Sequence, residues 1–306
     1  MPPVTPPFFI IAGPTAVGKS DLAVAVAERC GGEIVGADAF QIYRGLEILT
    51  AQPSAELRAR VPHYLVGEIP LAQSFDVAQY LRAAGERISE IHARGRVPIV
   101  AGGTGLYLRA LTRGLADLPG ADAKLRADLA KETPAELQRR LTGLDPVGAA
   151  QTDLQNPRRV IRALEVCLLT GRPFSSFREE WNAAPHDTRG IVVTLDRATL
   201  HARIDQRTAA MFASGVIEEV RAAGDVGPTA GQTLGFREIR ALLAGQLDPA
   251  ACIAAIQIAT RRYAKRQMTW FRRETALATV DLTGVSNFAQ LSESLAREAA
   301  RDCRGS

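Results

Sequence analysis

Residues 8–30 read FFIIAGPTAVGKSDLAVAVAERC, and this stretch decides the fold class. Phe8–Ala12 is short and wholly apolar, which is typical of a strand buried on both faces of a parallel sheet. Asp21–Arg29 has a helical spacing of apolar residues and ends at two glycines. The loop between them matches the pattern GxxxxGK[ST] at every fixed position, as Gly13-Pro14-Thr15-Ala16-Val17-Gly18-Lys19-Ser20. Strand, glycine-rich loop and helix in this order predict a phosphate-binding loop.

The residue types of this loop suit a di- or triphosphate. Its backbone N–H groups can wrap phosphate oxygens at the positive end of the helix. Lys19 adds a positive charge, and the hydroxyl of Ser20 is placed to coordinate Mg²⁺. The loop alone leaves the phosphate compound open. A small-molecule kinase that uses ATP is one reading, whereas the lack of an NKxD motif disfavours a GTPase.

The rest of the first hundred residues repeats the strand–helix pattern. Strands are predicted at 33–37 (EIVGA) and 97–101 (VPIVA), with a long helix over 75–94 between them. This alternation predicts right-handed crossovers, and therefore a parallel sheet flanked by helices. A last strand is expected at 191–195 (IVVTL). The remainder of the chain is expected to be helical, over 200–221, 235–244 and 249–273.

The segment between 116 and 189 has a different character. Strand signals stop there, and short helical stretches are separated by Pro119, Pro134, Pro146, Pro157 and Pro173. We expect an all-helical insertion in an α/β core of the P-loop NTPase type. The predicted organisation is a first core part at 1–115, the insertion at 116–189, and a return to the core at 190–306.

The composition is that of an ordinary globular protein. The 306-residue chain is 46% hydrophobic and 23% charged, which excludes collagen-like and disordered chains. A net charge of +4 permits a nucleic-acid partner without requiring one. The scattered cysteines Cys30, Cys167, Cys252 and Cys303 indicate reduced thiols rather than disulfides or zinc ligands. Neither a signal peptide nor a membrane-length apolar run is recognised, so we expect a cytoplasmic protein, monomeric by default.

Two polar residues follow predicted strands at the sheet edge where open α/β folds bind ligands. Asp38 follows the strand at 33–37, where a carboxylate could hold Mg²⁺ through water or accept a proton from a nucleophile. Thr104, in GGTG after the strand at 97–101, could donate to a phosphate or position an incoming group. Each could instead cap a turn or a helix.

Arg203 and Arg207 lie four residues apart, so they share a face of the predicted helix. Their guanidinium groups suit a diphosphate leaving group, and solvated pairing with Asp205 or Glu218 is the alternative.

A second set of arginines lies on the insertion. Arg158, Arg159 and Arg162 share one helical face there, which suits nucleic-acid phosphates but is equally typical of a solvated surface. Basic and aromatic residues alternate over 261–273, where we expect the aromatic side chains in the core and the basic ones outside. The histidines have no ligand spacing, so no transition metal is expected.

These and other segments resemble the tRNA dimethylallyltransferase family. They run in family order from residue 13 to about 273, and the ordered set is far more specific than the phosphate loop alone. The matching segments are GPTAVGKS (13–20), GADAFQIYRGLEILTAQP (36–53), VPHYL (61–65), IVAGGTGLYLRAL (99–111), NPRRVIRALEV (156–166), LHARIDQR (200–207), LGFREI (234–239) and KRQMTWFRR (265–273).

The resemblance implies transfer of a dimethylallyl group from dimethylallyl diphosphate to N6 of adenosine 37, next to the anticodon, in tRNAs reading codons that begin with U. Loop residues 13–20 and Arg207 would hold the diphosphate, with Mg²⁺ on Ser20. Asp38 would be the general base, with Thr104 and Arg207 as further catalytic residues. The residues implied to contact the tRNA anticodon stem-loop are Asp38, Ala39, Phe40, Gln41, Thr104, Arg126, Arg158, Arg159, Val160, Ile161, Arg162, Gln232, Thr233, Leu234, Gly235, Phe236 and Arg237.

Two positions depart from the family pattern. Ala39 stands where Ser is common in DSMQ, and Gln52 stands where Lys is common, which removes one polar contact and one phosphate contact. Three other readings stay open: a relative that prenylates free adenine nucleotides, a kinase, and a non-catalytic RNA-binding protein. The helical insertion disfavours the first, and the intact Lys19 and Ser20 disfavour the last.

Overall fold

The chain forms two compact units. In this computed structural model, residues 6–116, 118–181 and 188–304 are described. The larger unit comprises Met1–Thr112 with Asp187–Ser306, and the smaller one is Arg113–His186. The bounds of the smaller unit lie three residues before those predicted for the insertion, 116–189. The first five residues, on which the prediction about a signal peptide partly rests, lie outside the described part of the chain.

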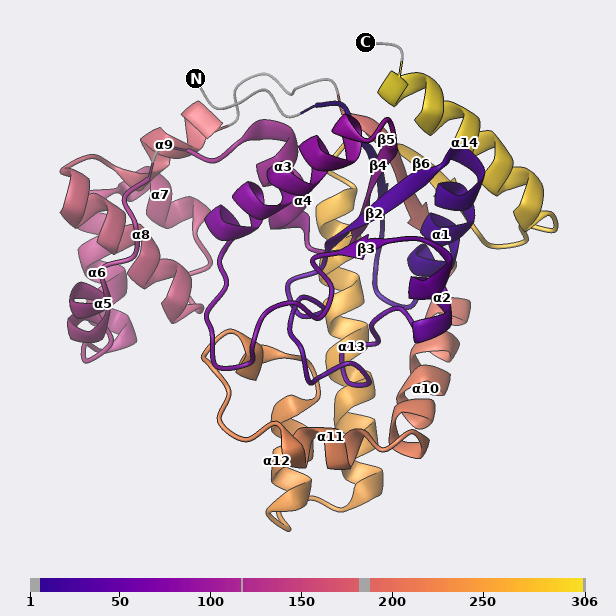
Figure 1. Cartoon of the computed structure of the whole chain (residues 1–306). Helices are drawn as coiled ribbons and strands as arrows, with labels where there is room; N and C mark the ends of the chain where they lie inside the picture. The colour runs from indigo at the N-terminus through magenta and orange to yellow at the C-terminus, as the bar shows by residue number, and fades with distance from the viewer. Residues whose placement is uncertain (1–5, 117, 182–187, 305–306) are drawn as a thin grey trace. The chain divides into compact units, whose positions relative to one another are not determined.

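The first half of the larger unit alternates strands and helices, as the sequence predicts (Figure 1). Its elements are β1 (Phe9–Ala12), α1 (Lys19–Cys30), β2 (Gly32–Ala37), α2 (Ala55–Arg60), β3 (His63–Tyr64), α3 (Val77–Ala93), β4 (Val97–Gly102) and α4 (Gly105–Arg113). Local sequence sets several boundaries: Gly31 ends α1 in the left-handed conformation, and Asp76 forms a capping box with Gln79 at the start of α3. The short strand β3 was not predicted, because two residues carry no periodic signal.

The second half of this unit is mainly helical. Its elements are β5 (Arg189–Thr194), α10 (Arg197–Ala213), α11 (Val216–Ala222), a 3-10 turn (Ala230–Gln232), α12 (Phe236–Leu243), α13 (Pro249–Phe271), β6 (Ala278–Asp281) and α14 (Phe288–Arg304). The single helix predicted over 200–221 is wrong, because the chain turns at Gly215, with a φ of 91°. The expectation of no strand after 195 is also wrong: β6 pairs with β5 although its side chains are largely exposed.

The strands form one six-stranded parallel sheet in the order β3-β2-β4-β1-β5-β6. Because β4 lies between β1 and β2, the turns that follow these three strands meet at one carboxyl edge. That edge is where an open α/β sheet binds ligands.

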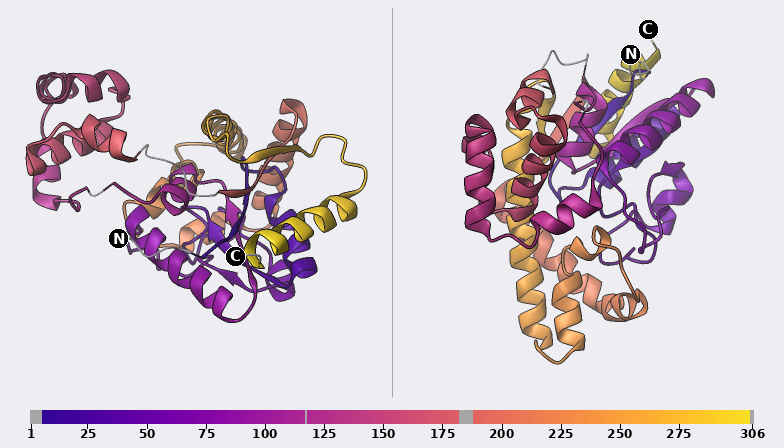
Figure 2. Two further views of the ribbon diagram at one scale, coloured as in Figure 1. Left: turned by 90° about the horizontal axis from the view of Figure 1, so that it is seen from above. Right: turned by 90° about the vertical axis from the view of Figure 1, so that its left-hand side faces the viewer.

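Alternating side chains of the strands enter two apolar layers. Phe9 and Ile11 of β1 pack with α1 and α14, whereas Ile10 packs with α3 and α4 on the other face. Helices α1 and α14 lie side by side (Figures 1 and 2). A third apolar cluster joins α10, α11, α12 and α13 to the loop after β2 through residues such as Leu49 and Ile256. The sheet thus has helices on both faces and a helical cluster of the same unit beside its ligand-binding edge.

The smaller unit is all helical in its described part, as predicted. It contains α5 (Ala123–Leu129), α6 (Pro134–Leu144), α7 (Pro146–Gln151), α8 (Pro157–Thr170) and α9 (Phe174–Trp181). Leu141, Val160 and Leu164 are buried in its core. Prolines begin three of its helices, where the missing N–H costs no hydrogen bond.

No helix in the described ranges is both long and apolar enough to span a lipid bilayer.

Candidate active site

The phosphate loop joins β1 to α1, and its tight path depends on glycine. A Cβ atom on Gly13 would lie only 2.5 Å from the carbonyl oxygen of Val193 in β5. Gly18 has a φ of 100° immediately before α1, a conformation that residues with side chains rarely adopt. These positions place Lys19 and Ser20 in the first turn of α1, where the helix dipole favours an anion.

Lys19 is the main positive charge of the loop. Its Nζ donates a hydrogen bond to the carbonyl oxygen of Pro14 at 2.6 Å. Burial lowers the pKa of Lys19 from 10.5 to about 8. The negative charge of Asp38 opposes this shift, and the positive charge of Arg207 adds to it. Lys19, Asp38 and Arg207 are therefore close enough to interact electrostatically.

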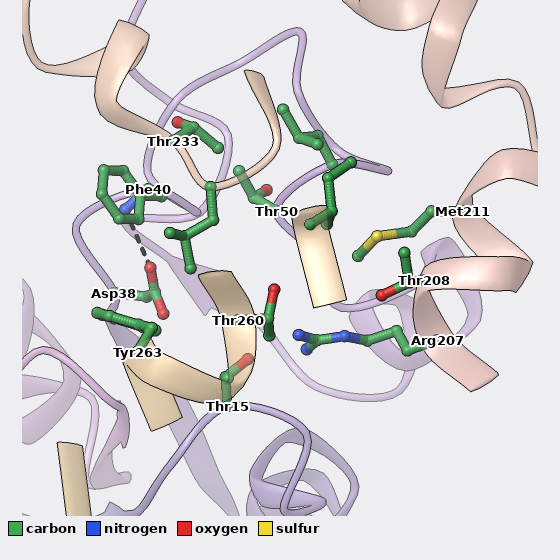
Figure 3. A pocket seen from close by; sticks show the side chains of 13 residues that line it. Thr15, Asp38, Phe40, Thr50, Arg207, Thr208, Met211, Thr233, Thr260 and Tyr263 are labelled. Carbon is green, nitrogen blue, oxygen red and sulfur yellow. Dashed lines mark hydrogen bonds between the residues drawn. The ribbon is translucent and has the colours of Figure 1, made fainter. Parts of the chain in front are cut away.

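Asp38 and Thr104 meet at the carboxyl edge of the sheet, as predicted. The backbone N–H of Ala39 donates to the Thr104 hydroxyl oxygen at 2.9 Å, which ties the end of β2 to the end of β4. One carboxylate oxygen of Asp38 accepts from the N–H of Phe40 at 2.9 Å (Figure 3) and from that of Gln41 at 3.3 Å. Asp38 thus stabilises the turn that follows β2, and it also lines the pocket drawn in Figure 3.

Arg207 extends from α10 toward Thr15 and Thr260 (Figure 3). Burial lowers the pKa of Arg207, and Asp38 opposes that shift. Its Nε is buried and has no hydrogen-bond partner among the described residues. A buried N–H donor without a partner costs free energy unless a ligand accepts from it.

Arg203 lies one turn before Arg207 on α10 and donates to the carbonyl oxygen of Val17 at 3.1 Å, inside the phosphate loop. The sequence left open that these two arginines pair with Asp205 or Glu218 at the surface. In the structure Asp205 pairs with Arg261, and Glu218 pairs with Arg221.

Two adjoining pockets meet at this point. They share four lining residues, namely Thr15, Asp38, Thr50 and Arg207. The first pocket is lined by the phosphate loop, and its other residues include Ala16, Gly18, Lys19, Ser20, Asp21 and Arg203. It is basic on balance, because three cationic side chains line it against two carboxylates. The second pocket is lined more by apolar and threonine side chains, including Phe40, Leu49, Met211, Thr233, Leu234, Ile256, Thr260 and Tyr263. The charged groups lie between a phosphate-type pocket and a pocket suited to less polar groups.

Helix α13 supplies residues that the sequence analysis did not place in the site. Tyr263 and Thr260 line the second pocket, although the aromatic residues of 261–273 were expected in the core. That expectation holds for Phe271, which is buried. Burial and the charge of Asp38 raise the pKa of Tyr263, so this phenol stays protonated at neutral pH. No segment matched to the family pattern contains Thr260 or Tyr263, and only the fold brings these two side chains to the pocket that Asp38 also lines.

The remaining predicted residues of the larger unit have mixed positions. Gln41 donates from its side chain to the carbonyl oxygens of Thr50 and Ala51, which fixes the loop after β2. In the segment 232–237, Thr233 and Leu234 line the second pocket. Phe236 instead belongs to the third apolar cluster, and Arg237 is exposed. Gln52, the departure from the family pattern, donates to the carbonyl oxygen of Tyr43 at 2.8 Å and lies outside the residues that line either pocket.

The three arginines of α8 do not form one uniform exposed ridge. Arg158 and Arg159 are exposed, but Arg162 pairs with Glu165, whose side chain is fully buried. Arg126 donates to the same carboxylate from α5 with two hydrogen bonds of 2.8 Å. These guanidinium groups hold the pKa of Glu165 below its ordinary value, although burial alone would raise it.

The neighbouring residues Val160 and Ile161 point mostly into the smaller unit. Val160 is buried in its core, and Ile161 is partly buried against it. The family resemblance implied tRNA contacts for all of 158–162, whereas in the structure Val160 is buried and Arg162 is paired with Glu165.

The family model for IPP transferase matches residues 41–274, most of the chain. The chain belongs to the IPP transferase family. It is 45% identical over 293 residues to the tRNA dimethylallyltransferase of Geobacter sulfurreducens, covering 92% of this chain and 94% of that protein. It is 42% identical to the tRNA dimethylallyltransferase of Akkermansia muciniphila, covering 94% of this chain and 98% of that one.

Solved structures of this family are also similar. A full-length tRNA isopentenylpyrophosphate transferase from Bacillus halodurans has a TM-score of 0.70 and 33% identity, with 97% of this chain and 98% of that chain covered. A eukaryotic dimethylallyltransferase acting on tRNA has a TM-score of 0.79 and 26% identity, with 94% and 77% covered. The family resemblance and the fold class inferred from the sequence are thus confirmed.

Proposed function

We propose that this chain transfers the dimethylallyl group of dimethylallyl diphosphate to N6 of adenosine 37 in tRNAs that read codons beginning with U. The products are N6-isopentenyladenosine and diphosphate. One observation carries the proposal: Asp38 lines both the basic pocket and the less polar pocket beside it. The names of close relatives over most of their length support it. We expect the enzyme to act in the cytoplasm, in keeping with its scattered cysteines.

The basic pocket is the site we assign to the diphosphate. Lys19, Arg207 and the N-terminal end of α1 concentrate positive charge on it. The partnerless Nε of Arg207 gives an anion an unused donor. These groups would stabilise the negative charge that grows on diphosphate as the allylic C1–O bond breaks, and their fixed positions make that stabilisation effective.

The pocket also fits Mg²⁺. No cluster of three or more His, Cys, Asp or Glu side chains suited to a metal occurs among the described residues. A metal there would therefore take most ligands from diphosphate and water, which is the coordination that Mg²⁺ prefers. The Ser20 hydroxyl is the protein ligand we assign. Bound Mg²⁺ would supply a further positive charge to the leaving group.

Asp38 would act on the acceptor. The lone pair of adenine N6 is delocalised into the ring, which makes N6 a weak nucleophile. As N6 forms the bond to C1 of the prenyl group, one N6 proton must leave. The Asp38 carboxylate would take that proton while the C1–O bond electrons depart with diphosphate. The second oxygen of Asp38 can do this while the first keeps its backbone hydrogen bonds.

The second pocket is the site we assign to the prenyl chain and the adenine. Phe40 and Tyr263 offer flat apolar faces, and Thr104 fixes the turn that carries Asp38. An adenine that enters such a pocket must leave the stack of the anticodon loop, at a cost of a few kcal/mol that pocket contacts offset. Among the residues that the family resemblance implied for the tRNA, we assign the exposed Arg158 and Arg159 of the smaller unit to its phosphates.

The test is incubation of the purified chain with Mg²⁺ and radiolabelled dimethylallyl diphosphate, in parallel with unmodified tRNA and with AMP, ADP or ATP. We expect label in tRNA, and none when the adenosine beside the anticodon is replaced. Label in free nucleotides alone would assign the chain to the nucleotide-prenylating class. No prenyl transfer, combined with transfer of the γ-phosphate of ATP to a small molecule, would replace the proposal with a kinase.

A further inference from the structure

Gln267 connects the phosphate loop to the turn after β4. This buried side chain comes from α13, near the end of that 23-residue helix. Its Oε1 accepts a hydrogen bond from the backbone N–H of Thr15 at 2.9 Å. Its Nε2 donates to the carbonyl oxygen of Gly103 at 2.8 Å. One amide therefore joins two active-site turns that are 88 residues apart in sequence, through a helix more than 160 residues further on.

The turn after β4 is shaped to admit this helix. A Cβ atom on Gly103 would lie 2.3 Å from Nε2 of Gln267, and one on Gly105 would lie 2.3 Å from the Trp270 ring. A side chain at Gly103 would displace the Gln267 amide, and one at Gly105 would collide with the Trp270 ring. The glycines of GGTG therefore let α13 approach close enough for the Gln267 amide to reach the loop.

The same face of α13 serves the other pocket. Thr260 and Tyr263 line that pocket, and they precede Gln267 by seven and four residues, which places all three on one helical face. The helix thus offers one rigid surface to the proposed acceptor site and to the proposed diphosphate site.

We propose that Gln267 is a positioning residue for the diphosphate site, which holds Thr15 and its loop in the conformation that binds the anion. The inference rests on the proposed function. Because Gln267 takes up the Thr15 N–H, that group is fixed before any ligand binds and is not a phosphate donor. The cradle then consists of the N–H groups that follow, together with Lys19 and Arg207. Thr15, which lines both pockets, is fixed with the loop.

The experiment compares Gln267→Glu and Gln267→Met with the wild-type chain, and Gln290→Glu, an exposed glutamine of α14, is the matched control. The readout is the Kd of inorganic diphosphate with Mg²⁺, measured by calorimetry between pH 5.5 and 8 at a temperature where each variant is folded by circular dichroism. A protonated glutamic acid can replace both amide bonds, because its carbonyl accepts and its O–H donates. The ionised form can only accept, and it places a negative charge against the Gly103 carbonyl oxygen.

We expect the Kd of Gln267→Met to rise by about tenfold or more at every pH, because the partly buried Thr15 N–H and the buried Gly103 carbonyl lose their partner. For Gln267→Glu the same loss is expected at pH 8, with recovery toward the wild-type value as the pH falls, since burial raises the pKa of a carboxyl group. The Kd of Gln290→Glu should follow that of the wild type. A residue with a merely structural role would lower the melting temperature without this pH-dependent recovery.

Folded Gln267 variants that bind diphosphate like the wild type would overturn the inference. So would weak binding by Gln267→Glu alone, since that would be a charge effect. If Gln267→Met does not fold, the pH profile of Gln267→Glu decides between the outcomes. Wild-type protein that binds diphosphate but transfers no prenyl group would refute the proposed function and leave the role of Gln267 standing.

Discussion

The pKa of Lys19 makes diphosphate binding depend on pH in a defined way. At a pKa of about 8, the charged form outnumbers the neutral form roughly ten to one at pH 7, and the ratio is reversed at pH 9. Bound diphosphate favours the charged form, so binding above pH 8 must take up a proton. We therefore expect the advantage of the wild-type chain over Lys19→Met in diphosphate affinity to shrink about tenfold between pH 7 and pH 9.

The assay is the Kd of Mg²⁺-diphosphate for both proteins across this range. Taking the ratio of the two Kd values cancels the titration of diphosphate itself and of every other group that the two proteins share. A ratio that stays constant from pH 7 to 9.5 would refute the reasoning, because Lys19 would then keep its proton throughout.

The lowered pKa of Lys19 also predicts that, without ligand, the free energy of unfolding changes with pH in the opposite direction to the diphosphate affinity. Between pH 8 and 10.5 the folded chain has lost the Lys19 proton that the unfolded chain still holds. The unfolded state then binds more protons, so the free energy of unfolding rises with pH in this window. Relative to Lys19→Met, the wild type should gain stability from pH 8 to 10.5 while its diphosphate affinity falls. Parallel loss of both would indicate general alkaline unfolding.

Three further changes test other parts of the site. Asp38→Asn should cut single-turnover prenyl transfer by ~10²-fold or more, because the amide cannot take the proton, although its oxygen can still accept from the Phe40 N–H. Arg158→Ala combined with Arg159→Ala should lower the slope of log K against log salt for tRNA by about one to two, as measured by filter binding, because two phosphate contacts are lost. Glu165→Gln should destabilise the smaller unit by about 1–3 kcal/mol in denaturant unfolding, a value reduced from that of a fully buried pair because its arginine partners are partly exposed.

Each of these has a clear opposite result. Equal turnover by wild type and Asp38→Asn would remove Asp38 from the proton transfer. An unchanged salt slope would mean that Arg158 and Arg159 are solvated surface and no more. A Glu165→Gln chain as stable as the wild type would show that the ion pairs of Arg126 and Arg162 contribute no net stability.

Local sequence determined the core elements and most of the site. The apolar run, glycine-rich loop and helical pattern between 8 and 30 are sufficient to predict β1, the phosphate loop and α1. Each of these depends on neighbours only a few residues away. Asp38 and Thr104 were predictable for a related reason: in a parallel sheet, the ends of successive strands face one edge. The ordered motifs then identified the family without any three-dimensional information.

Contacts between distant segments were beyond the reach of the sequence. The hydrogen bonds of Gln267 and the pocket position of Tyr263 depend on where α13 crosses the sheet edge. The ion pairs of Glu165 depend on how α5 packs on α8, and β6 exists as a strand because β5 offers it a free edge. The motifs thus assigned the phosphate loop and its proposed chemistry, whereas tertiary packing decided which side chains hold that loop in place. Local patterns record backbone propensity and periodicity, but a contact across a hundred residues is fixed only when the chain has folded.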